Sequence, residues 1–215
     1  MELKNINGWF FPDNEEHFVK TVGPFPETNY QQRAFSEALF ITRNRNCFID
    51  IGANIGLHTV RSASYFNFVH SFEPAKTNYE ALCKNSETFT NINTYNVALG
   101  REESVGDLKI PKASGNLGSF SLRDFNAIRE EELFIEKVNI KSLDSYELMP
   151  DLIKIDAQGF EVQILQGSIN TICKYSPVVL IEMVKYNSDK ITKLLGEYSY
   201  TLYKKIKKDG VWIKK

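Results

Sequence analysis

The chain has 215 residues, a length at which one compact domain is the usual arrangement, so we expect a single domain over residues 1–215. Hydrophobic residues make up 42% of the chain and charged residues 25%, which excludes a disordered chain and a small disulfide scaffold. Lys and Arg total 26 against 27 Asp and Glu, and the net charge of -1 provides no general attraction for nucleic acid or anionic lipid. We therefore expect a small-molecule or glycan partner, no nucleic acid and no membrane, and the sequence leaves the oligomeric state open.

The chain also lacks the usual signals for export. Its longest apolar stretches, such as Val178–Ile181, are far shorter than the roughly 20 residues that cross a bilayer. The stretch Met1–Phe11 has no basic segment followed by a long apolar one, so a secretion signal is not indicated. Three widely spaced cysteines, Cys47, Cys83 and Cys173, favour buried free thiols in a reducing compartment. These features predict a cytoplasmic location.

Apolar runs typical of strands alternate with helical patterns from residue 47 onward. Strands are expected at 47–51, 68–73, 94–99, 151–156 and 178–182, with helices at 57–66, 77–89, 160–173 and 188–198. The last two strands, 200–206 and 211–213, form an antiparallel pair with Asp209-Gly210 in the turn. This order predicts an α/β fold with a doubly wound, Rossmann-like seven-stranded sheet, mostly parallel with a C-terminal antiparallel hairpin.

Two regions depart from the alternation. Residues 1–46 form an N-terminal arm with an aromatic cluster, Trp9–Pro12, and a helix, Tyr30–Thr42, that packs against the sheet or covers its open edge. Residues 101–146 separate two strands by far more than an ordinary connection, and insertions of this size commonly contribute to binding pockets. Within this insertion, Ser114–Ser119 has the composition of a turn, either a polar contact for a ligand or a plain hairpin tip.

Candidate binding residues follow the strands, where doubly wound sheets bind their ligands. The small-residue turn Gly52–Gly56 allows close approach of a ligand, but Asn54 in the middle glycine position disfavours a pyrophosphate cofactor. Glu73 ends the second strand about 20 residues further on, where a carboxylate accepts ribose hydroxyls. Asp156 ends the fourth strand and faces the same crevice. Together these groups suggest S-adenosylmethionine, which has no phosphate and whose cationic groups favour nearby carboxylates.

The motifs in this order resemble those of the FkbM-type methyltransferases, a branch of the class I S-adenosylmethionine-dependent enzymes. The resemblance rests on Ile49–Gly56, Phe72-Glu73-Pro74, Asn96–Gly100, Ser142-Leu143-Asp144, Ile153–Asp156 with Gly159 and Glu161, Leu165-x-Gly167, and Pro177 with Glu182. It implies S-adenosylmethionine as the cofactor, bound by Asp50, Gly52, Ala53, Asn54, Gly56, Glu73, Val97, Ala98 and Asp156. In this family pattern Asp50 lies near the methionine amino group, Glu73 binds the ribose, and Val97 and Ala98 lie near the adenine. One position departs from the family pattern, because Gln158 stands where the family usually has Glu.

The expected reaction is O-methylation of a hydroxyl on a sugar, glycan or secondary metabolite. Asp156 and His58 are the candidate catalytic residues, since a general base assists attack by a hydroxyl. Candidate acceptor contacts are Trp9, His17, Ser119, Gln158 and Glu182. We expect no metal, and Glu161 is expected to be structural at the start of its helix. The lysines of residues 204–208 are expected to form a solvated hairpin face.

Two alternatives to a working methyltransferase remain. A nicotinamide-dependent oxidoreductase would share the fold, although Asn54 speaks against its dinucleotide turn. A catalytically degenerate member that binds only the nucleoside is suggested by Gln158, because glutamine cannot serve as a base. Turnover of S-adenosylmethionine separates both from the leading hypothesis.

Overall fold

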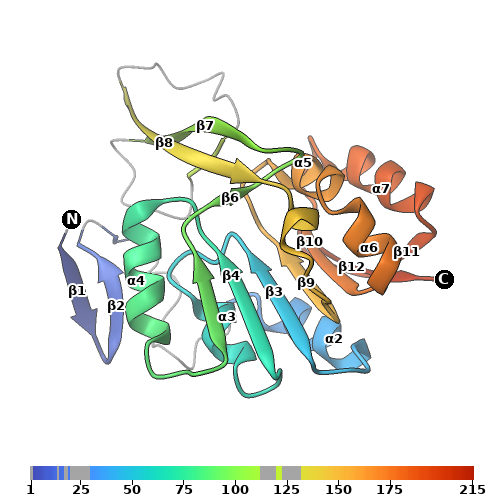
Figure 1. Cartoon of the computed structure of the whole chain (residues 1–215), viewed down its shortest axis with the longest axis horizontal. Helices are drawn as coiled ribbons and strands as arrows, with labels where there is room; N and C mark the ends of the chain where they lie inside the picture. The colour runs from blue at the N-terminus through green and yellow to red at the C-terminus, as the bar shows by residue number, and fades with distance from the viewer. Residues whose placement is uncertain (1, 14, 17–18, 20–29, 112–119, 123–131) are drawn as a thin grey trace.

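A computed structural model describes residues 2–13, 15, 16, 19, 30–111, 120–122 and 132–215. Its centre is a seven-stranded sheet with the order β11-β12-β10-β9-β3-β4-β5 (Figure 1). The strands are β3 (Cys47–Ile51), β4 (Phe68–Phe72), β5 (Ile92–Tyr95), β9 (Leu152–Ile155), β10 (Val178–Glu182), β11 (Tyr200–Ile206) and β12 (Asp209–Lys214). Neighbouring strands from β10 to β5 are parallel, and β12 runs antiparallel to both β10 and β11. This confirms the predicted mostly parallel sheet with its C-terminal hairpin.

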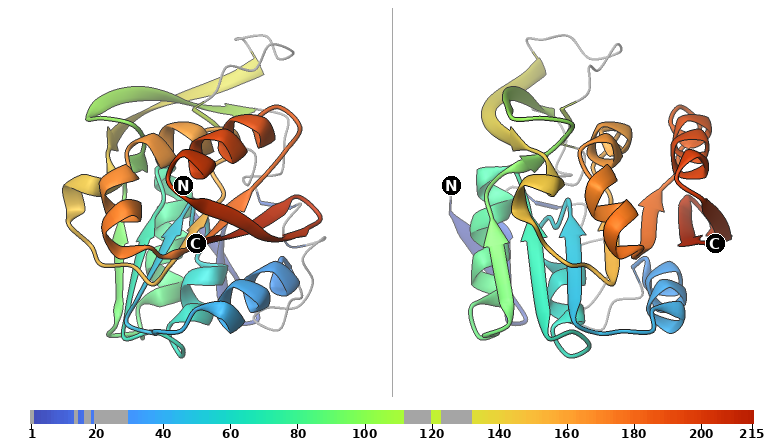
Figure 2. Two further views of the ribbon diagram at one scale, coloured as in Figure 1. Left: turned by 90° about the vertical axis from the view of Figure 1, so that its right-hand side faces the viewer. Right: turned by 45° about the vertical axis from the view of Figure 1, so that its right-hand side comes forward.

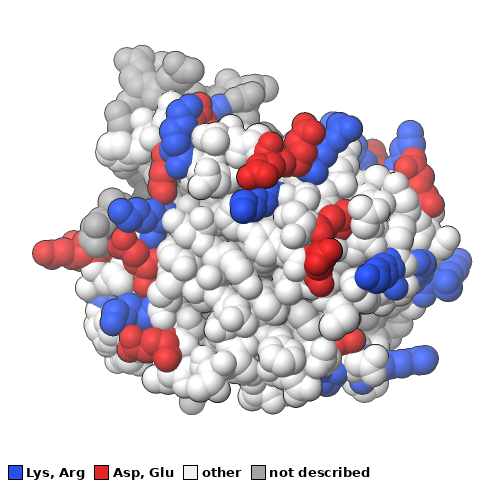
Figure 3. Space-filling model, in the orientation of Figure 1, with Lys and Arg blue, Asp and Glu red and all other residues white. Residues whose placement is uncertain are grey.

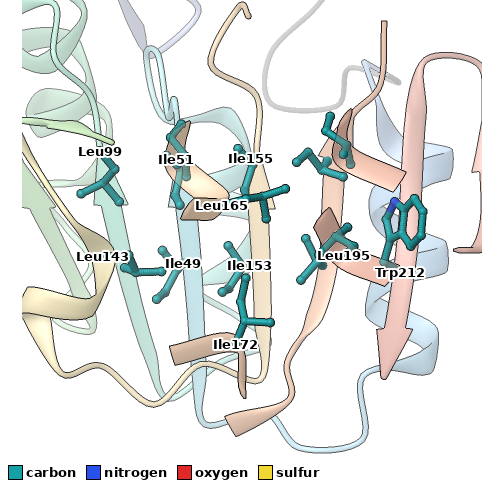
Figure 4. Packing of buried hydrophobic residues seen from close by; sticks show 14 of the residues in the cluster. Ile49, Ile51, Leu99, Leu143, Ile153, Ile155, Leu165, Ile172, Leu195 and Trp212 are labelled. Carbon is teal, nitrogen blue, oxygen red and sulfur yellow. The ribbon is translucent and has the colours of Figure 1, made fainter. Parts of the chain in front are cut away.

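Helices cover both faces of the sheet (Figure 2). One layer contains α5 (Glu161–Gln166), α6 (Ile169–Tyr175) and α7 (Ser188–Glu197), and the remaining helices are α2 (Gln32–Ile41), α3 (Leu57–Ser62) and α4 (Lys76–Ser86). Side chains alternate along each strand, so Ile49 and Ile153 pack with the first layer (Figure 4), while Phe48 and Leu152 pack with α2. By the same alternation Asp50 shares the face of Phe48 and lies on the opposite face from Ile49.

A second sheet lies beyond the carboxyl ends of β3 and β4 (Figures 1 and 2). It consists of β6 (Ala98–Leu99), β7 (Ser104–Pro111) and β8 (Leu133–Lys141), in the order β6-β8-β7. The predicted strand 94–99 is therefore wrong, because its two halves belong to different sheets. The chain turns at Asn96, whose side-chain Nδ2 donates to the carbonyl oxygens of Glu73 and Pro74, both at 2.9 Å. Residues 101–146 thus build most of this second sheet and a short 3₁₀ helix, Leu143–Tyr146.

Two further predictions need correction. The expected helix 160–173 is divided at Gly167, where a Cβ atom would overlap the carbonyl oxygen of Gly100, so the chain must bend at this close contact. The turn of the C-terminal hairpin consists of Lys207 and Lys208, because Ile206 pairs with Asp209 and Lys207 adopts a φ of 56°. Gly210 lies within β12, where a Cβ atom would collide with Met183.

The N-terminal arm forms a hairpin of β1 (Leu3–Ile6) and β2 (Trp9–Pro12). Its inner side chains, Trp9 and Phe11, are buried against Leu57 and Ala81 of α3 and α4. The arm is therefore anchored to the helices beside β3 and β4.

Surface properties complete this description. Acidic and basic side chains are interspersed on the face shown in Figure 3. No helix of the described residues has the length and apolar character to cross a membrane. All three cysteines are free, but Cys173 is exposed and Cys83 half-buried, so the expectation of three buried thiols holds for Cys47 alone.

Candidate functional site

A cavity of about 300 Å³ lies at the carboxyl ends of β3, β4 and β9, beneath the second sheet. This volume falls at the lower end of the roughly 300–1,000 Å³ typical of small-molecule sites. Polar lining comes from Tyr30, Gln31, Asn54, His58, Glu73, Asn78, Lys154, Asp156, Gln158 and Lys208, and apolar lining includes Phe72, Val97, Ala98, Leu99, Leu108, Phe120, Leu122 and Phe160. On one side of β3 lie β4 and β5, which follow it in the chain, and on the other side lie the later strands β9 and β10. The strand order therefore reverses at β3, and such a switch point is where doubly wound sheets bind ligands.

The small-residue turn after β3 is shaped by close backbone contacts. A Cβ atom on Gly52 would overlap the carbonyl oxygen of Asp156, so the loops after β3 and β9 touch only because residue 52 is glycine. Asn54 has a φ of 53°, a left-handed conformation that asparagine tolerates better than most residues. Gly56 also has a positive φ, but a Cβ there would lie 2.7 Å from Leu82 Cδ1 and the residue is outside the cavity lining. Gly56 thus packs against α4, and its cofactor contact stays a prediction.

Glu73 faces this turn from the end of β4. Its carboxylate accepts the backbone N–H of Asn54 at 2.8 Å on Oε2 and that of Ala75 at 3.0 Å on Oε1. Burial raises the pKa of Glu73 to about 7, although both backbone N–H groups favour the ionised form. A carboxylate offers about four lone-pair positions, so two donors leave acceptor capacity on each oxygen. The group is thus positioned to accept two further hydroxyls.

Asp50 occupies a different environment from the expected one. It is fully buried and accepts from Lys154 Nζ at 3.0 Å and from Thr59 Oγ1 at 2.8 Å. Asp50 and Lys154 are register partners on neighbouring parallel strands, which explains why the pair forms. Burial alone would lower the pKa of Lys154, but the carboxylates of Asp50 and Asp156 outweigh it and raise the value. Asp50 is outside the cavity lining and supports Lys154, while its contact with a ligand amino group stays a prediction.

Asp156 follows β9, so β3 lies between its strand and β4, the strand that Glu73 follows. Two glutamine side chains donate to it, Gln31 Nε2 to Oδ2 at 3.0 Å and Gln158 Nε2 to Oδ1 at 2.9 Å. His58 Nε2 lies 3.1 Å from the amide oxygen of Gln31. Burial, together with Lys154 and Arg61, lowers the pKa of His58 well below its usual value, so the imidazole is neutral. A carboxylate, two amides and a neutral imidazole therefore meet at this end of the cavity.

A second acidic group, Glu182, lies next to a lysine of the cavity lining. Glu182 at the end of β10 forms an ion pair with Lys208, and Lys208 lines the cavity. Burial and the nearby Asp156 raise the pKa of Glu182 to about 7, against the effect of Lys208. The same two causes raise the pKa of Asp209 to about 6. The expectation that the 204–208 lysines are only a solvated face is thus wrong for Lys208, while Glu182 itself is outside the lining.

The remaining predicted residues separate into three groups. Val97 and Ala98 are buried and line the apolar part of the cavity. Trp9 packs in the core cluster beside the N-terminal hairpin and is outside the lining, and its acceptor contact stays a prediction. His17 and Ser119 lie outside the described residues.

Glu161 braces the loop after β9. Its Oε1 accepts the backbone N–H groups of Ala157 at 3.1 Å and Gly159 at 2.9 Å, and its Oε2 accepts from Asn187 Nδ2. These contacts fit the expected structural role. Among the described residues, no group of three or more His, Cys, Asp or Glu side chains is arranged to hold a metal.

The polar cavity residues that were not singled out as site candidates from the sequence include Tyr30, Gln31, Lys154 and Lys208. A lysine inside the apolar run Leu152–Ile155 was a usable signal, because a charge in a buried strand requires a partner. Nothing in the local pattern marks the other three residues, which reach the cavity only through tertiary folding.

Comparisons with known proteins identify similar sequences and folds. Residues 50–202 match the family model described as the methyltransferase FkbM domain. Over 156 residues the chain is 26% identical to the hexuronic acid methyltransferase AglP of Haloferax volcanii, an alignment that covers 69% of this chain and 60% of that protein. The chain thus spans less than two thirds of this relative's length.

Two solved structures are similar in fold. The methyltransferase FkbM of Methylobacillus flagellatus superposes with a TM-score of 0.54 at 16% identity, covering 79% of this chain and 43% of that one. A precorrin-6y C5,15-methyltransferase of Geobacter metallireducens gives a TM-score of 0.53 at 12% identity, with 94% and 93% covered. At these identities the likeness supports the fold alone.

Proposed function

Since this chain belongs to the FkbM methyltransferase domain family, we propose that it transfers a methyl group from S-adenosylmethionine to a hydroxyl of a sugar or glycan. The observation that carries the proposal is the cavity at the switch point, lined by the Gly52 turn after β3, by Glu73 after β4 and by Asp156 after β9. The family match leaves no support for the nicotinamide-dependent alternative.

Glu73 is the proposed contact for the ribose. Its two oxygens each retain acceptor capacity after the bonds from Asn54 and Ala75, and the two ribose hydroxyls are a matching pair of donors. Apolar side chains, including Phe72, Val97 and Leu108, provide the surface that a planar adenine ring needs. The residues present therefore fit the nucleoside part of the cofactor.

The opposite end of the cavity suits the cationic part of the cofactor. Asp156 lines this end, and its negative charge favours a sulfonium and an ammonium group. Gly52 and Ala53 contribute backbone to the lining, where the absence of bulky side chains permits close approach. When bound, S-adenosylmethionine supplies an electrophilic methyl group for in-line displacement.

Asp156 is the proposed general base. Its carboxylate lies in the cavity with capacity to accept the proton of an attacking hydroxyl, in addition to the two amide donors. His58 fits this task poorly, because its lowered pKa makes it a weak base and its Nε2 already faces Gln31. Leu108, Phe120 and Leu122 contribute apolar surface to the lining, which disfavours water beside the reacting groups and favours methyl transfer over hydrolysis.

The acceptor class rests on two observations. The curated relative is named a hexuronic acid methyltransferase, and a sugar acid carries both a hydroxyl and a carboxylate. Lys208 provides a cation at the cavity lining that matches such a carboxylate. Sugar acids are therefore the first acceptors to test, with the corresponding neutral sugars as the comparison.

Calorimetric titration with S-adenosylmethionine tests the cofactor part. We expect saturable one-site binding to the wild type and at least about tenfold weaker binding for Glu73→Gln, since charged hydrogen bonds contribute about 1.5–3 kcal/mol. Glu87→Gln is the matched control, because Glu87 is an exposed glutamate beyond the end of α4. Absence of binding to the folded wild type would refute the proposal.

Turnover tests the catalytic part. Purified protein is incubated with S-adenosylmethionine and with methyl glucuronide or methyl glucoside, and formation of S-adenosylhomocysteine and of a methylated sugar is followed by mass spectrometry. We expect product with the sugar acid and about 100-fold slower turnover for Asp156→Asn. Binding without product across a broad panel of hydroxyl acceptors would favour the degenerate nucleoside-binding alternative.

A further inference from the structure

Gln31 belongs to a part of the chain for which no function has been assigned. It immediately precedes α2 and lies outside residues 50–202, which match the family model. Nevertheless it lines the cavity beside Asp156 and His58. The segment before α2 therefore contributes a side chain to the centre of the site.

The two ends of the Gln31 amide have different partners. Its Nε2 donates to Asp156 Oδ2 at 3.0 Å, and its Oε1 lies 3.1 Å from His58 Nε2. An ionised carboxylate only accepts hydrogen bonds, so the NH₂ group must face Asp156 and the amide oxygen must face the histidine. The histidine must then carry its proton on Nε2. Because burial keeps this imidazole neutral, its Nδ1 is an unprotonated acceptor without a partner among the described residues.

The backbone at Gln31 is held in a conformation that glutamine seldom adopts. Its φ of 48° and ψ of 12° are left-handed, which strains the backbone of a residue that has a side chain of this type. Arg61 Nη1 donates to the carbonyl oxygen of Tyr30 at 3.0 Å, and the backbone N–H of Phe35 donates to that of Gln31 at 3.1 Å. These contacts on both sides keep the strained residue in place.

Gln158 has the same combination of features on the other side of the carboxylate. Its φ is 50°, and its Nε2 donates to Asp156 Oδ1 at 2.9 Å. Each oxygen of Asp156 thus accepts one amide donor from a residue in left-handed conformation. A glutamate at either glutamine position would instead bring a second carboxylate to within hydrogen-bond distance, where two negative charges repel.

We infer that Gln31 is a positioning residue, which orients the carboxylate of Asp156 toward the acceptor hydroxyl and is itself fixed by neutral His58. This inference rests on the proposed function of Asp156 as the base. The catalytic geometry of such a group must be held closely, since a displacement of about 1 Å costs about 100-fold in rate. In this arrangement His58 acts through Gln31 and not as a proton acceptor from substrate.

The hydrogen-bond chain is tested by the tautomer of His58, measured from long-range ¹H–¹⁵N correlation spectra. The chain has three histidines, so His17→Gln and His70→Gln variants assign the spectrum. We expect His58 to be neutral at pH 7 with its proton on Nε2, and Gln31→Met to shift that Nε2 signal. A proton on Nδ1, or a charged ring, in the wild type would overturn the inference. This arm needs neither cofactor nor acceptor, so it is independent of the proposed function.

The positioning role is tested by kinetics with the acceptor that the wild type methylates. We expect Gln31→Met to lower kcat about 100-fold while the Kd for S-adenosylmethionine changes less than twofold, because the residue acts on the base. Gln32→Met is the matched control, since the adjacent glutamine is exposed and should retain wild-type rates. Wild-type kcat for Gln31→Met would overturn the inference, whereas absence of cofactor binding to the wild type would instead overturn the proposed function.

Gln31→Glu adds a readout that a structural defect alone would not change. It places a carboxylate in the position of the donor, so we expect kcat to recover partly toward acidic pH as the two carboxylates come to share a proton. The charged or titratable groups that act on Asp156 from the surrounding elements are Tyr30, Lys154, Glu182, Lys208 and Asp209. These five are unchanged in this variant, and His58, whose Nε2 faces residue 31, is the further titratable group that the new carboxylate contacts, so the ratio of its kcat to the wild-type kcat reports residue 31 together with Asp156 and His58. A ratio that is constant between pH 6 and 9 would contradict the positioning role. This isosteric variant also serves if Gln31→Met does not fold.

Discussion

Replacing Glu73 by glutamine should change how the stability of the protein depends on pH. Burial raises the pKa of Glu73 from its ordinary value of 4.5 to about 7 in the folded protein. At pH values between these two, the native state keeps a proton that the unfolded chain has lost, so rising pH favours unfolding. This contribution to stability is fully present below pH 4.5, is lost as pH rises through 7 and then stays constant.

The magnitude follows from the size of the pKa change. A rise from 4.5 to about 7 corresponds to about 3 kcal/mol of the free energy of unfolding. Glutamine does not titrate, so the variant lacks this pH-dependent contribution to stability. Its NH₂ group cannot accept a hydrogen bond, so one of the two backbone N–H donors, at Asn54 or Ala75, loses its acceptor. The lost bond costs about 1–3 kcal/mol at every pH. The variant should therefore be less stable at pH 4.5, and the wild type should lose that advantage as pH rises.

Urea denaturation of both proteins at pH 4.5, 6, 7 and 8 measures the effect. We expect the wild-type free energy of unfolding, minus that of Glu73→Gln, to fall by about 3 kcal/mol over this range. His58, Glu182 and Asp209 also titrate here, but they are present in both proteins and their contributions cancel in the difference. Glu87→Gln should show no such trend. A difference that stays constant, or that increases with pH, would refute the reasoning.

Three further substitutions test the placement of residues in and around the cavity. Gly52→Ala should lower the free energy of unfolding by about 3 kcal/mol or more, measured by urea denaturation, because the new Cβ overlaps the carbonyl oxygen of Asp156 at a positive φ; a smaller loss would show that the two loops separate easily. Lys154→Met should cost about 3–5 kcal/mol by leaving Asp50 buried without its cation, and adding Asp50→Asn should recover most of that loss in a double-mutant cycle. Without such recovery, the ion pair would not explain the effect of the single variant. Trp9→Ala should lower the free energy of unfolding by about 3–5 kcal/mol, because Trp9 is buried in the core. The calorimetric Kd for S-adenosylmethionine should stay within twofold of the wild-type value, and much weaker binding would indicate that Trp9 contacts the cofactor.

Strand ends were the most informative part of the sequence. Gly52, Glu73 and Asp156 each follow a short apolar run, and parallel strands bring such positions to one edge of a sheet. The structure places all three on one cavity. Asp50 shows the limit of this reasoning, because it lies inside its strand and the alternation of side chains directs it to Lys154 in the protein interior.

The alternation of strands and helices in the central layer, the mostly parallel sheet and the edge that carries the candidate site were determined by the sequence itself. These features depend on hydrophobic periodicity and on turn residues, which are local properties of the chain. The contacts of Gln31 with Asp156, 125 residues away, and of Lys208 with Glu182 were decided only by the tertiary structure. Polar residues at the ends of elements have no periodic pattern, and their partners depend on how the surrounding helices and loops pack. For this reason the sequence locates the site, while the folded structure determines which side chains complete it.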